Sequence, residues 1–568
     1  MKDLLKKPQT PLVILALIVV AYAIVTFTNL GDLHAPQTFV STTASQRIVL
    51  DLGDNYDISR INLYVGIGDA RYTFEDSYDG ATWHSISTTY DEKGNSTNEA
   101  TIKADYANFF AWHVARVDTS GRYLRVTAWE ADAMLGEVAV YGPDGQIPIV
   151  SSTQPEVADE QQYAQRSKTD KNSTYFDEIY HARTAYEILH EIPIYETTHP
   201  PLGKLLISIG IWIFGMVPFG WRFMGALAGV IMLPVLYLIA KKLFNDAYIA
   251  LLATGLLALD FMHFSLTRIS TIDSYPVLFI LLTFLFLIDY IKRTLSPEFD
   301  FWSRVKPLLW SGIFFGLGCA SKWITLYAAF GILALIILTW VRSGGKRASV
   351  TSKEIMKHFY VCCVTFIVIP AIVYFMAYIP QMRYSLNNES PIKYVVQSQK
   401  YMYKYHSALV AEHAFSSPAS TWPLIKRPLW AYMDEEASAY GNVGSIVIMG
   451  NPAIWWLGSL AMLALLIWAL YKRSFVSAFI GIGFLTQYVV WLSVSRILFI
   501  YHFFASVPFI ILALCFWLKR APRWASWSML GVSALLFVAF YPVLSGHVVS
   551  LDYAEKLVWF KSWILFAR

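Results

Sequence analysis

The feature that most constrains this chain is a series of apolar runs, each about as long as the roughly 20 residues that a helix needs to cross a bilayer. The first run, residues 11–29, follows Lys2, Lys6 and Lys7 and has no small-residue cleavage site at its end, so it predicts an uncleaved first span. Of 568 residues, 56% are hydrophobic and 15% are charged, whereas soluble domains have about 25% charged residues. We therefore predict a polytopic α-helical membrane protein.

Basic residues at the ends of these runs predict the topology, because Lys and Arg concentrate in cytoplasmic loops. After the first span within residues 1–30, we predict ten more, at 222–243, 247–264, 273–291, 306–321, 323–341, 358–379, 452–471, 474–492, 497–518 and 524–545. With these eleven spans the N-terminus is cytoplasmic, and the basic clusters fall on the same side: Lys241-Lys242, Lys292-Arg293, Arg304-Lys306, Arg342-Lys346-Arg347, Lys472-Arg473 and Lys519-Arg520. The second loop, 380–451, and the C-terminal tail, 546–568, are then external.

Composition also limits the chemistry. The net charge of +4 is small and the basic residues are scattered in pairs, which implies no nucleic-acid partner. The four cysteines all lie in apolar segments: Cys319, Cys362, Cys363 and Cys515. No disulfide framework is expected in the polar region 30–200, and redox chemistry is not expected.

Residues 36–145, in the first external loop, are predicted to form a β-sandwich. Strand-sized runs with alternating polarity are separated by Gly, Asp and Asn turns, and they lie at 47–52, 61–65, 123–127 and 137–141. Phrases such as Ser77-Tyr78-Asp79-Gly80-Ala81-Thr82-Trp83 resemble discoidin-type, galactose-binding-like jelly rolls. That resemblance implies a module that binds a glycan or a surface, although a spacer that only packs on the membrane domain is the alternative. The polar residues 146–172 are predicted to be a linker.

Residues 173–221 carry dense charge just where the chain re-enters the membrane. Asn172-Ser173-Thr174 are good helix-capping residues before Asp177 and Glu178. Residues 202–217 are apolar but too short for a span, so we predict an external interfacial helix.

With the predicted topology, polar side chains gather outside or in the outer third of a span. They are Asp177, Glu178, His199, Lys204, Arg222, Asp260, His263, Arg268, Asp273, Lys322, Arg496 and His502. Because a charge placed centrally costs about 2.5–3.5 kcal/mol on insertion scales, so many at one level predict a shared polar cavity. A cavity that combines carboxylates with cations and opens to lipid suits a substrate with an anionic head and an apolar tail.

Glycosyl transfer from a lipid phosphate fits such a cavity. The phosphate leaving group needs charge neutralisation more than protonation, so one carboxylate suffices as the base for an incoming hydroxyl, and single displacement inverts the anomeric centre. Asp177 is our candidate base. Glu178 points about 100° away around a helix, so it is expected to orient the base or the acceptor.

Eight phrases together resemble the protein O-mannosyltransferases, integral-membrane glycosyltransferases of the GT-C class. They are Phe176-Asp177-Glu178-Ile179, His199-Pro200-Pro201-Leu202-Gly203-Lys204, Pro218-Phe219-Gly220-Trp221-Arg222, Ser321-Lys322-Trp323, His413-Ala414-Phe415-Ser416-Ser417-Pro418, Trp422-Pro423-Leu424, Gly450-Asn451-Pro452 and Arg496-Ile497-Leu498-Phe499-Ile500-Tyr501-His502. The resemblance implies transfer of mannose from polyprenyl-phosphate mannose to Ser or Thr of an external protein, without an essential metal or other cofactor. It also implies that Asp177, Glu178 and Arg222 matter for activity. Residues 380–451 are too short for the MIR repeats of eukaryotic members, as in shorter prokaryotic members.

These motifs supply the remaining site predictions. We expect contacts to the lipid phosphate or the sugar from His199, Lys204, Arg222, Lys322, Arg496, Tyr501 and His502. On the acceptor side we expect His413 and Trp422. No metal site is predicted, since His406, His413 and the acidic pair have no recognised ligand spacing.

Simpler readings remain open for each residue. Acidic residues in a first helical turn are favoured by the helix dipole alone, and His199-Pro200-Pro201 can be only a rigid turn. Lys204, Arg222 and Lys322 can reach interfacial headgroups. An interfacial aromatic belt explains Trp422, and His502 can be a satisfied interfacial histidine.

Three rival functions also remain open. One keeps the lipid-phosphate donor but uses another sugar, or a cell-envelope polymer or lipid as acceptor. A second is a transporter of lipid-linked sugars, although no internal repeat is visible. A third is a glycan-binding surface protein, for which eleven spans are excessive.

Overall fold

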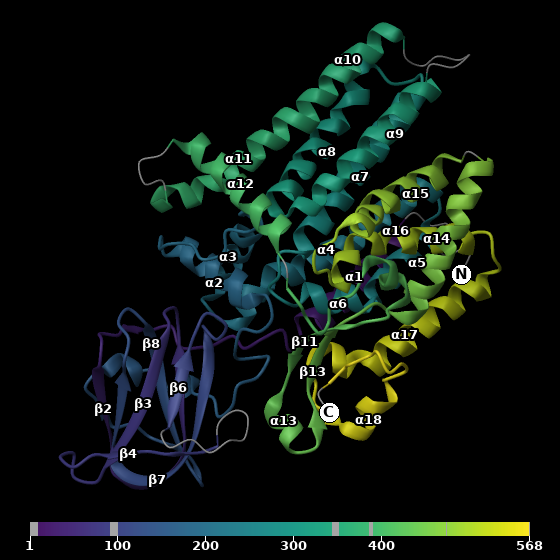
Figure 1. Ribbon diagram of the computed structural model, residues 1–568. Coiled ribbons are helices and arrows are strands. Elements are labelled where there is room, and N and C mark those ends of the chain that lie inside the picture. Colours follow the sequence, from purple (N-terminus) through teal and green to yellow (C-terminus); the bar gives the residue numbers. More distant parts are fainter. Residues whose placement is uncertain are drawn as a thin grey trace. The chain divides into compact units, whose positions relative to one another are not determined.

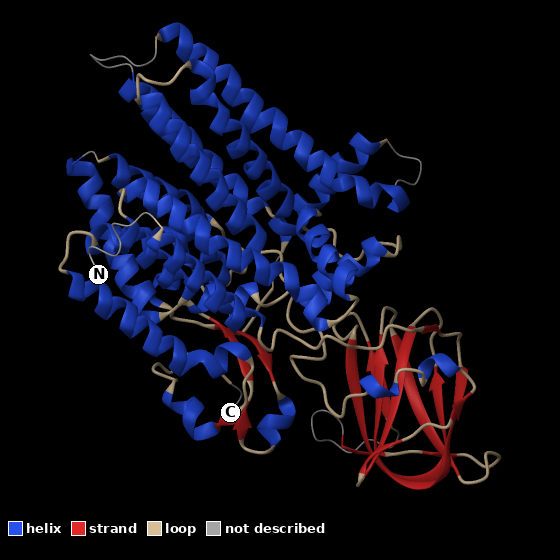
Figure 2. Ribbon diagram, turned by 180° about the vertical axis from the view of Figure 1, so that it is seen from behind, coloured by secondary structure: helices blue, strands red, loops and turns tan. Residues whose placement is uncertain are grey.

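The computed structural model describes residues 9–90, 100–343, 351–385, 390–409, 411–472 and 474–566. Several basic residues used to predict the topology lie outside these ranges: Lys2, Lys6, Lys7, Lys346, Arg347 and Arg473. The chain divides into two compact units. The sheet unit comprises Asn29–Tyr186 and Ser208–Arg222, and the helical unit comprises Met1–Thr28, Glu187–Ile207 and Phe223–Arg568. Most strands belong to the first and most helices to the second (Figure 1, Figure 2).

The sheet unit is built on four long antiparallel strands, β2 (Gln46–Val65), β3 (Ala70–Ser77), β7 (Ala111–Ala128) and β8 (Met134–Gly142). The order along the sheet is β1-β8-β2-β7-β3-β4. Its shorter strands are β1 (Val40–Ser41), β4 (His84–Ser85), β5 (Thr88–Tyr90), β6 (Thr101–Ala104), β9 (Gly145–Ile147) and β10 (Ser151–Ser152). All four predicted strand runs lie in strands, so the all-β prediction is confirmed. The discoidin-type resemblance stays a prediction.

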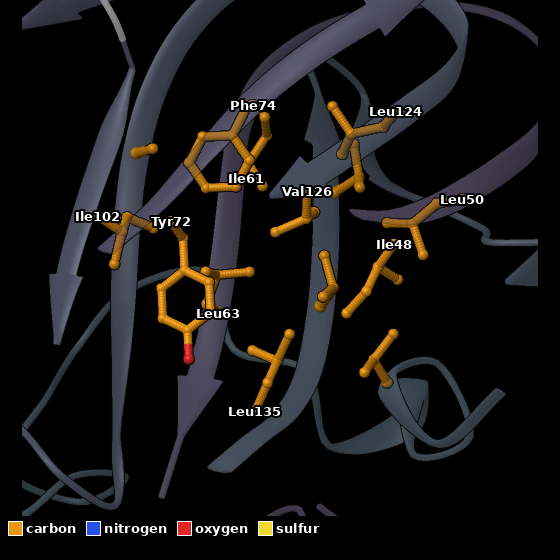
Figure 3. Packing of buried hydrophobic residues seen from close by; sticks show 14 of the residues in the cluster. Ile48, Leu50, Ile61, Leu63, Tyr72, Phe74, Ile102, Leu124, Val126 and Leu135 are labelled. Carbon is orange, nitrogen blue, oxygen red and sulfur yellow. The ribbon is translucent and has the colours of Figure 1, made fainter. Parts of the chain in front are cut away.

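Residues 47–52 and 61–65, predicted as two strands, form one long strand that changes register between Asp51 and Tyr56 and again between Ile58 and Arg60. Both halves of β2 bury alternate side chains in one core (Figure 3). Ile48 and Leu50 come from the first half, and Ile61 and Leu63 from the second. The period of two in the sequence thus sets which side chains face the core, as in any strand with one buried face.

Residues 146–172 are more than a linker, because they are tied to the sheet. Besides β9 and β10, they contain the short 3-10 helices η2 (Pro155–Val157) and η3 (Gln161–Tyr163). Asn62 Nδ2 donates to the carbonyl of Gln165 at 2.7 Å, and the Glu160 N–H donates to Glu137 Oε2 at 3.0 Å. Polar residues without a strand pattern here satisfy polar groups of the sheet.

Nine helices among the described residues are long and apolar enough to cross a membrane. They are α1 (Thr10–Phe27), α4 (Pro218–Phe244), α7 (Ser274–Leu295), η4 with α9 (Trp323–Ser343), Lys353–Arg383, α14 (Pro452–Lys472), α15 with η7 (Phe475–Ser493), η8 with α16 (Ile500–Leu518) and α17 (Arg523–Ser545). A tenth span is formed if α5 (Ala247–Ala258) and α6 (Phe261–Thr267), bent by 57°, count together. The chain is a multi-pass membrane protein.

The remaining predicted span, 306–321, corresponds to α8 (Phe301–Ser321), a helix of 21 residues. It packs beside α7, α9 and α11 (Ile369–Ser385) (Figure 1), but basic residues and glycines keep it outside the nine. The eleven-span topology stays a prediction. The apolar stretch 202–217 contains α3 (Leu202–Phe214), which with 13 residues is shorter than a span.

The second external loop holds the remaining elements. They are α12 (Pro391–Ala408), η6 (Ala419–Leu424), β11 (Leu429–Met433), α13 (Glu435–Ala439), β12 (Asn442–Val443) and β13 (Ser445–Ile448). β11 pairs with β13, and β12 pairs with β14 (Val549–Ser550) of the C-terminal tail, which also contains α18 (Leu551–Lys556). The loop and the tail are therefore folded together.

Candidate active site

The acidic pair stands where the chain enters α2 (Glu178–Leu189). Phe176 has a φ of +52°, and the Asp177 carbonyl accepts from the N–H groups of Tyr180 and His181 at 3.1 Å each. Asp177 is half-buried, whereas Glu178 is 0% exposed. The two adjacent carboxylates therefore occupy different environments, and only Asp177 has access to solvent.

Glu178 is paired with Arg222 inside the sheet unit. Arg222 Nε lies 2.7 Å from Glu178 Oε1, and Arg222 Nη2 lies 2.8 Å from Oε2, which is the two-pronged geometry of a strong ion pair. Trp221 Nε1 donates to the same Oε2 at 3.2 Å. The Glu178 carboxylate is therefore occupied by the protein itself.

Arg222 also uses every other donor of its guanidinium. Nη1 donates to the carbonyls of Leu30 at 2.9 Å and Asp170 at 2.6 Å, and Nη2 donates to the carbonyl of Ser173 at 3.1 Å. A guanidinium has five N–H groups, and all five are used. This geometry corrects two predictions, since it leaves Arg222 no donor for a lipid phosphate and Glu178 no free oxygen edge for an acceptor. A buried charge must be fully paired, and the pair meets that requirement.

Lys204 is a second saturated cation, within the helical unit. Its side chain is 0% exposed, and Nζ donates to the carbonyls of Glu196 and His199 at 3.0 Å each and to the Glu196 carboxylate. An ammonium has three donors, so none is left for a phosphate. The same carboxylate lies 3.1 Å from His199 Nδ1. The predicted role of Lys204 in phosphate binding is therefore corrected to a structural one.

A cavity of about 550 Å³ in the helical unit collects the remaining cations. We call it the cation cavity. It is lined by Thr198, His199, Pro200, Lys322, Trp323, Ile324, Tyr327, Tyr403, His406, Ser407, Trp491, Ser493, Val494, Ser495, Arg496 and His502. Four of the predicted substrate-binding residues, His199, Lys322, Arg496 and His502, thus meet at one site.

The two permanent cations of this cavity are not saturated. Lys322 Nζ lies 2.7 Å from Asp273 Oδ1 and 5.5 Å from the centre of the Tyr501 ring. One carboxylate leaves two of its three N–H donors without a hydrogen bond to the residues described. Arg496 is half-buried, and no described side chain or carbonyl forms a hydrogen bond or ion pair with its guanidinium. Both can therefore hold an anion.

Histidines complete the wall, and burial lowers the pKa of two of them. The pKa of His406 falls to about 4, and the pKa of His199 falls although the Glu196 carboxylate opposes the shift. His406 Nε2 lies 2.8 Å from the carbonyl of Thr198, which can only accept, so Nε2 carries the proton. At neutral pH these rings are uncharged and supply polar contacts rather than positive charge.

His502 belongs to an aromatic stack. Its ring is 4.4 Å from Tyr501 at 18° and 6.0 Å from Trp422 at 11°, and Nδ1 lies 2.9 Å from the carbonyl of Phe499. Trp422 is 0% exposed, and its Nε1 donates to the carbonyl of Ser417 at 3.1 Å. The prediction that Trp422 contacts the acceptor, and the alternative of an interfacial belt, are both corrected, because this ring is a buried support for His502.

The comparison with known families decides the assignment. The model of the dolichyl-phosphate-mannose-protein mannosyltransferases matches residues 169–384, and that of the C-terminal four-TMM region of protein-O-mannosyltransferase matches residues 391–563. This chain belongs to the protein O-mannosyltransferase family. It is therefore a glycosyltransferase, as the motifs predicted, and the matched residues begin after the β-strands of the sheet unit.

Relatives support the family assignment along most of the chain. The polyprenol-phosphate-mannose–protein mannosyltransferase of Mycolicibacterium smegmatis is 26% identical over 462 residues, which is 70% of this chain and 89% of that protein. The enzyme of the same name from Mycobacterium tuberculosis is 25% identical over 459 residues, 70% of this chain and 88% of that one. The yeast Pmt1–Pmt2 complex bound to its sugar donor has a TM-score of 0.60 at 13% identity, over 69% of this chain and 89% of that chain. This structure shows the shared fold, as predicted for the GT-C class.

Several residues of this protein O-mannosyltransferase were missed in the sequence or given no role. Glu196, which joins Lys204 to His199, stands three residues before the histidine, and that spacing is the one available signal. Asp273 belonged to the predicted polar set but had no assigned partner. Trp491 lines the cavity from within an apolar run, where nothing in the sequence distinguishes it from a lipid-facing residue.

Among the described residues of this mannosyltransferase, one group has the geometry to hold a metal, Glu137, Asp159 and Glu160 in the sheet unit. Burial raises the pKa of Glu137 to about 8, and Gln161 and the Glu160 N–H donate to its carboxylate. None of the predicted catalytic or substrate-binding residues belongs to this group. The absence of a metal requirement stays a prediction.

Proposed function

We propose that this chain transfers mannose from polyprenyl-phosphate mannose to Ser and Thr hydroxyls of proteins on the extracytoplasmic face of the membrane. The names of its relatives indicate the donor and the protein acceptor. The observation that carries the proposal is the cation cavity, where Lys322 and Arg496 have donors left for a phosphate. The proposed orientation, with a cytoplasmic N-terminus and an external active site and C-terminus, follows from the positive-inside rule.

In the proposed reaction Asp177 removes the proton of the acceptor hydroxyl. The hydroxyl oxygen attacks C1 of the mannosyl group, the bond from C1 to the phosphate oxygen breaks, and the electron pair leaves with the polyprenyl phosphate. The configuration at C1 inverts in this single displacement. Lys322 and Arg496 neutralise the charge that develops on the phosphate, so no general acid is needed.

Asp177 is preferred over Glu178 as the base because of their surroundings. A base must be free to approach the acceptor hydroxyl. Glu178 is fully buried and held by Arg222 and Trp221, whereas Asp177 is half-buried. No metal or other cofactor is proposed, and chelation with EDTA is expected to leave transfer unchanged. The sheet unit is proposed to bind a glycan or a surface ligand.

The test is a transfer assay in membranes supplied with polyprenyl-phosphate mannose and a Ser/Thr-rich polypeptide. We expect Asp177→Asn to lose nearly all transfer while its thermal unfolding matches that of the native chain. Glu191→Gln, which removes an exposed carboxylate just beyond the other end of α2, is the matched control and should transfer normally. Unchanged turnover in Asp177→Asn would remove this residue from the mechanism.

Mass spectrometry of external proteins, with and without the chain, identifies the sugar and the acceptor together. Mannose on Ser or Thr that depends on the chain supports the proposal. Another sugar, or a product on a cell-envelope polymer or lipid, would overturn it in favour of the related transferase activity.

A further inference from the structure

A second cavity adjoins the cation cavity within the helical unit. Its volume is about 830 Å³, and its lining comes from the segments 411–420 and 491–498. Four residues line both cavities: Trp491, Val494, Ser495 and Arg496. The segment 494–496 is therefore a wall between the two, and the Arg496 guanidinium belongs to both.

The two cavities differ in chemistry. The second one is lined largely by small side chains, such as Ala411, Ala414, Ser416 and Ser420, and its charges are one carboxylate, Glu412, and Arg496. A lipid tail would leave these polar groups without partners, at a cost in free energy. A second phosphate would face the carboxylate. Small side chains instead let another backbone approach closely.

The hydroxyl groups of this lining are available for hydrogen bonds. Ser416, Ser420 and Ser495 donate no side-chain hydrogen bond to the residues that the structure describes. A hydroxyl both donates and accepts, so it can bond the N–H or the C=O of a bound chain. A groove with small walls and free hydroxyls matches an extended polypeptide whose own side chains are small.

We propose that this second cavity is the acceptor groove, which holds an extended polypeptide and selects Ser or Thr flanked by small residues such as Ala, Pro and Ser. The inference rests on the proposed function. A transferase must hold both substrates at once, with reacting atoms about 3–3.5 Å apart. The shared wall places the donor phosphate and the acceptor segment on two sides of one guanidinium, that of Arg496.

The experiment fills the groove without touching the cation cavity. Ser420→Trp places an indole in the acceptor groove, and Leu424→Trp is the matched control on the same short helix, η6, where Leu424 is 65% exposed and lines neither cavity. For Ser420→Trp we expect the apparent KM for an Ala/Pro-flanked Ser peptide to rise at least tenfold. The KM for polyprenyl-phosphate mannose and inhibition by polyprenyl phosphate should stay within twofold of the native chain. Leu424→Trp should change none of these values.

Two outcomes would overturn the inference. Weaker inhibition by polyprenyl phosphate in Ser420→Trp would show that the groove holds the donor lipid instead. An unchanged peptide KM would show that no acceptor binds there. In the native chain, a Ser peptide with Trp on both sides should have a KM at least tenfold above that of the Ala-flanked peptide, and equal values would contradict the proposed selection.

Failure of the proposed function gives a different result. The native chain would then transfer no mannose to either peptide. Binding of an unreactive peptide, with Ala in place of Ser, reports on the groove alone. If Ser420→Trp weakens that binding at least tenfold while transfer is absent, the groove stands and the proposed reaction does not.

Discussion

Arg222 and Arg496 are two arginines from motifs of the same family, and the structure gives them opposite situations. All five donors of Arg222 end on protein acceptors, and the residue is 1% exposed. Arg496 lies on the wall of two cavities with its guanidinium unused by the described residues. Lys204 and Lys322 repeat the contrast, since the first is saturated and the second keeps donors. A cation in a functional motif can thus build the site or bind the substrate, and donor accounting tells the two apart.

The largest expected effect is on folding. Arg222→Met leaves the Glu178 carboxylate buried without its partner, so we expect the free energy of unfolding to fall by about 3–5 kcal/mol. Thermal or denaturant unfolding of the purified chain measures it. The double variant Arg222→Met/Glu178→Met should recover most of the loss, because removing both charges of a buried pair is often neutral. A variant Arg222→Met that folds normally and only needs more donor would break the comparison.

Lys204→Met should also cost stability, about 3 kcal/mol, because Glu196 loses the cation that neutralises it. Lys306→Met is a control at a basic residue with no hydrogen bond or ion pair to the described residues. The measurement is again unfolding, followed with and without polyprenyl phosphate. If the lipid phosphate protects the native chain but not Lys204→Met, while the two unfold alike in its absence, then Lys204 binds phosphate after all.

Arg496→Gln should show the opposite pattern. Since no folded partner is lost, we expect stability within about 0.5 kcal/mol of the native chain. The KM for polyprenyl-phosphate mannose should rise about tenfold, equivalent to about 1.4 kcal/mol of binding free energy. Lys426→Gln, an exposed residue of the same external loop as His413, should change neither value. Loss of stability in Arg496→Gln with unaltered donor KM would place Arg496 with the structural cations.

The smallest expected effect concerns pH. The pKa of His406 is about 4 in the folded chain, below the usual value for the unfolded one, so at pH 5 the unfolded chain binds a proton that the folded chain does not. Stability therefore falls as pH drops from 7 toward 4. His406→Gln keeps an amide N–H for the Thr198 carbonyl but cannot titrate, so its Tm should fall less between pH 7 and pH 5. Equal falls in both proteins would contradict a neutral, buried His406.

Sequence motifs predicted the reaction class and gathered the correct neighbourhood, but they did not separate the roles within it. His199, Lys322, Arg496 and His502 meet in one cavity as expected. Arg222 and Lys204, equally basic and equally placed in motifs, do not join them there. Their acceptors are mostly backbone carbonyls, such as those of Leu30, Asp170 and Ser173, and a carbonyl has no signature in the sequence.

The order of residues by itself determined that the chain is a polytopic membrane protein with an all-β region, because apolar length and the period of two are local properties that each segment carries alone. It also determined the family, because the motifs lie in order along the chain. Only the tertiary structure decided which cations are free, that Trp422 supports His502, and that two cavities share Arg496. Those properties depend on which donors find acceptors from distant segments, and that pairing exists only in the folded chain.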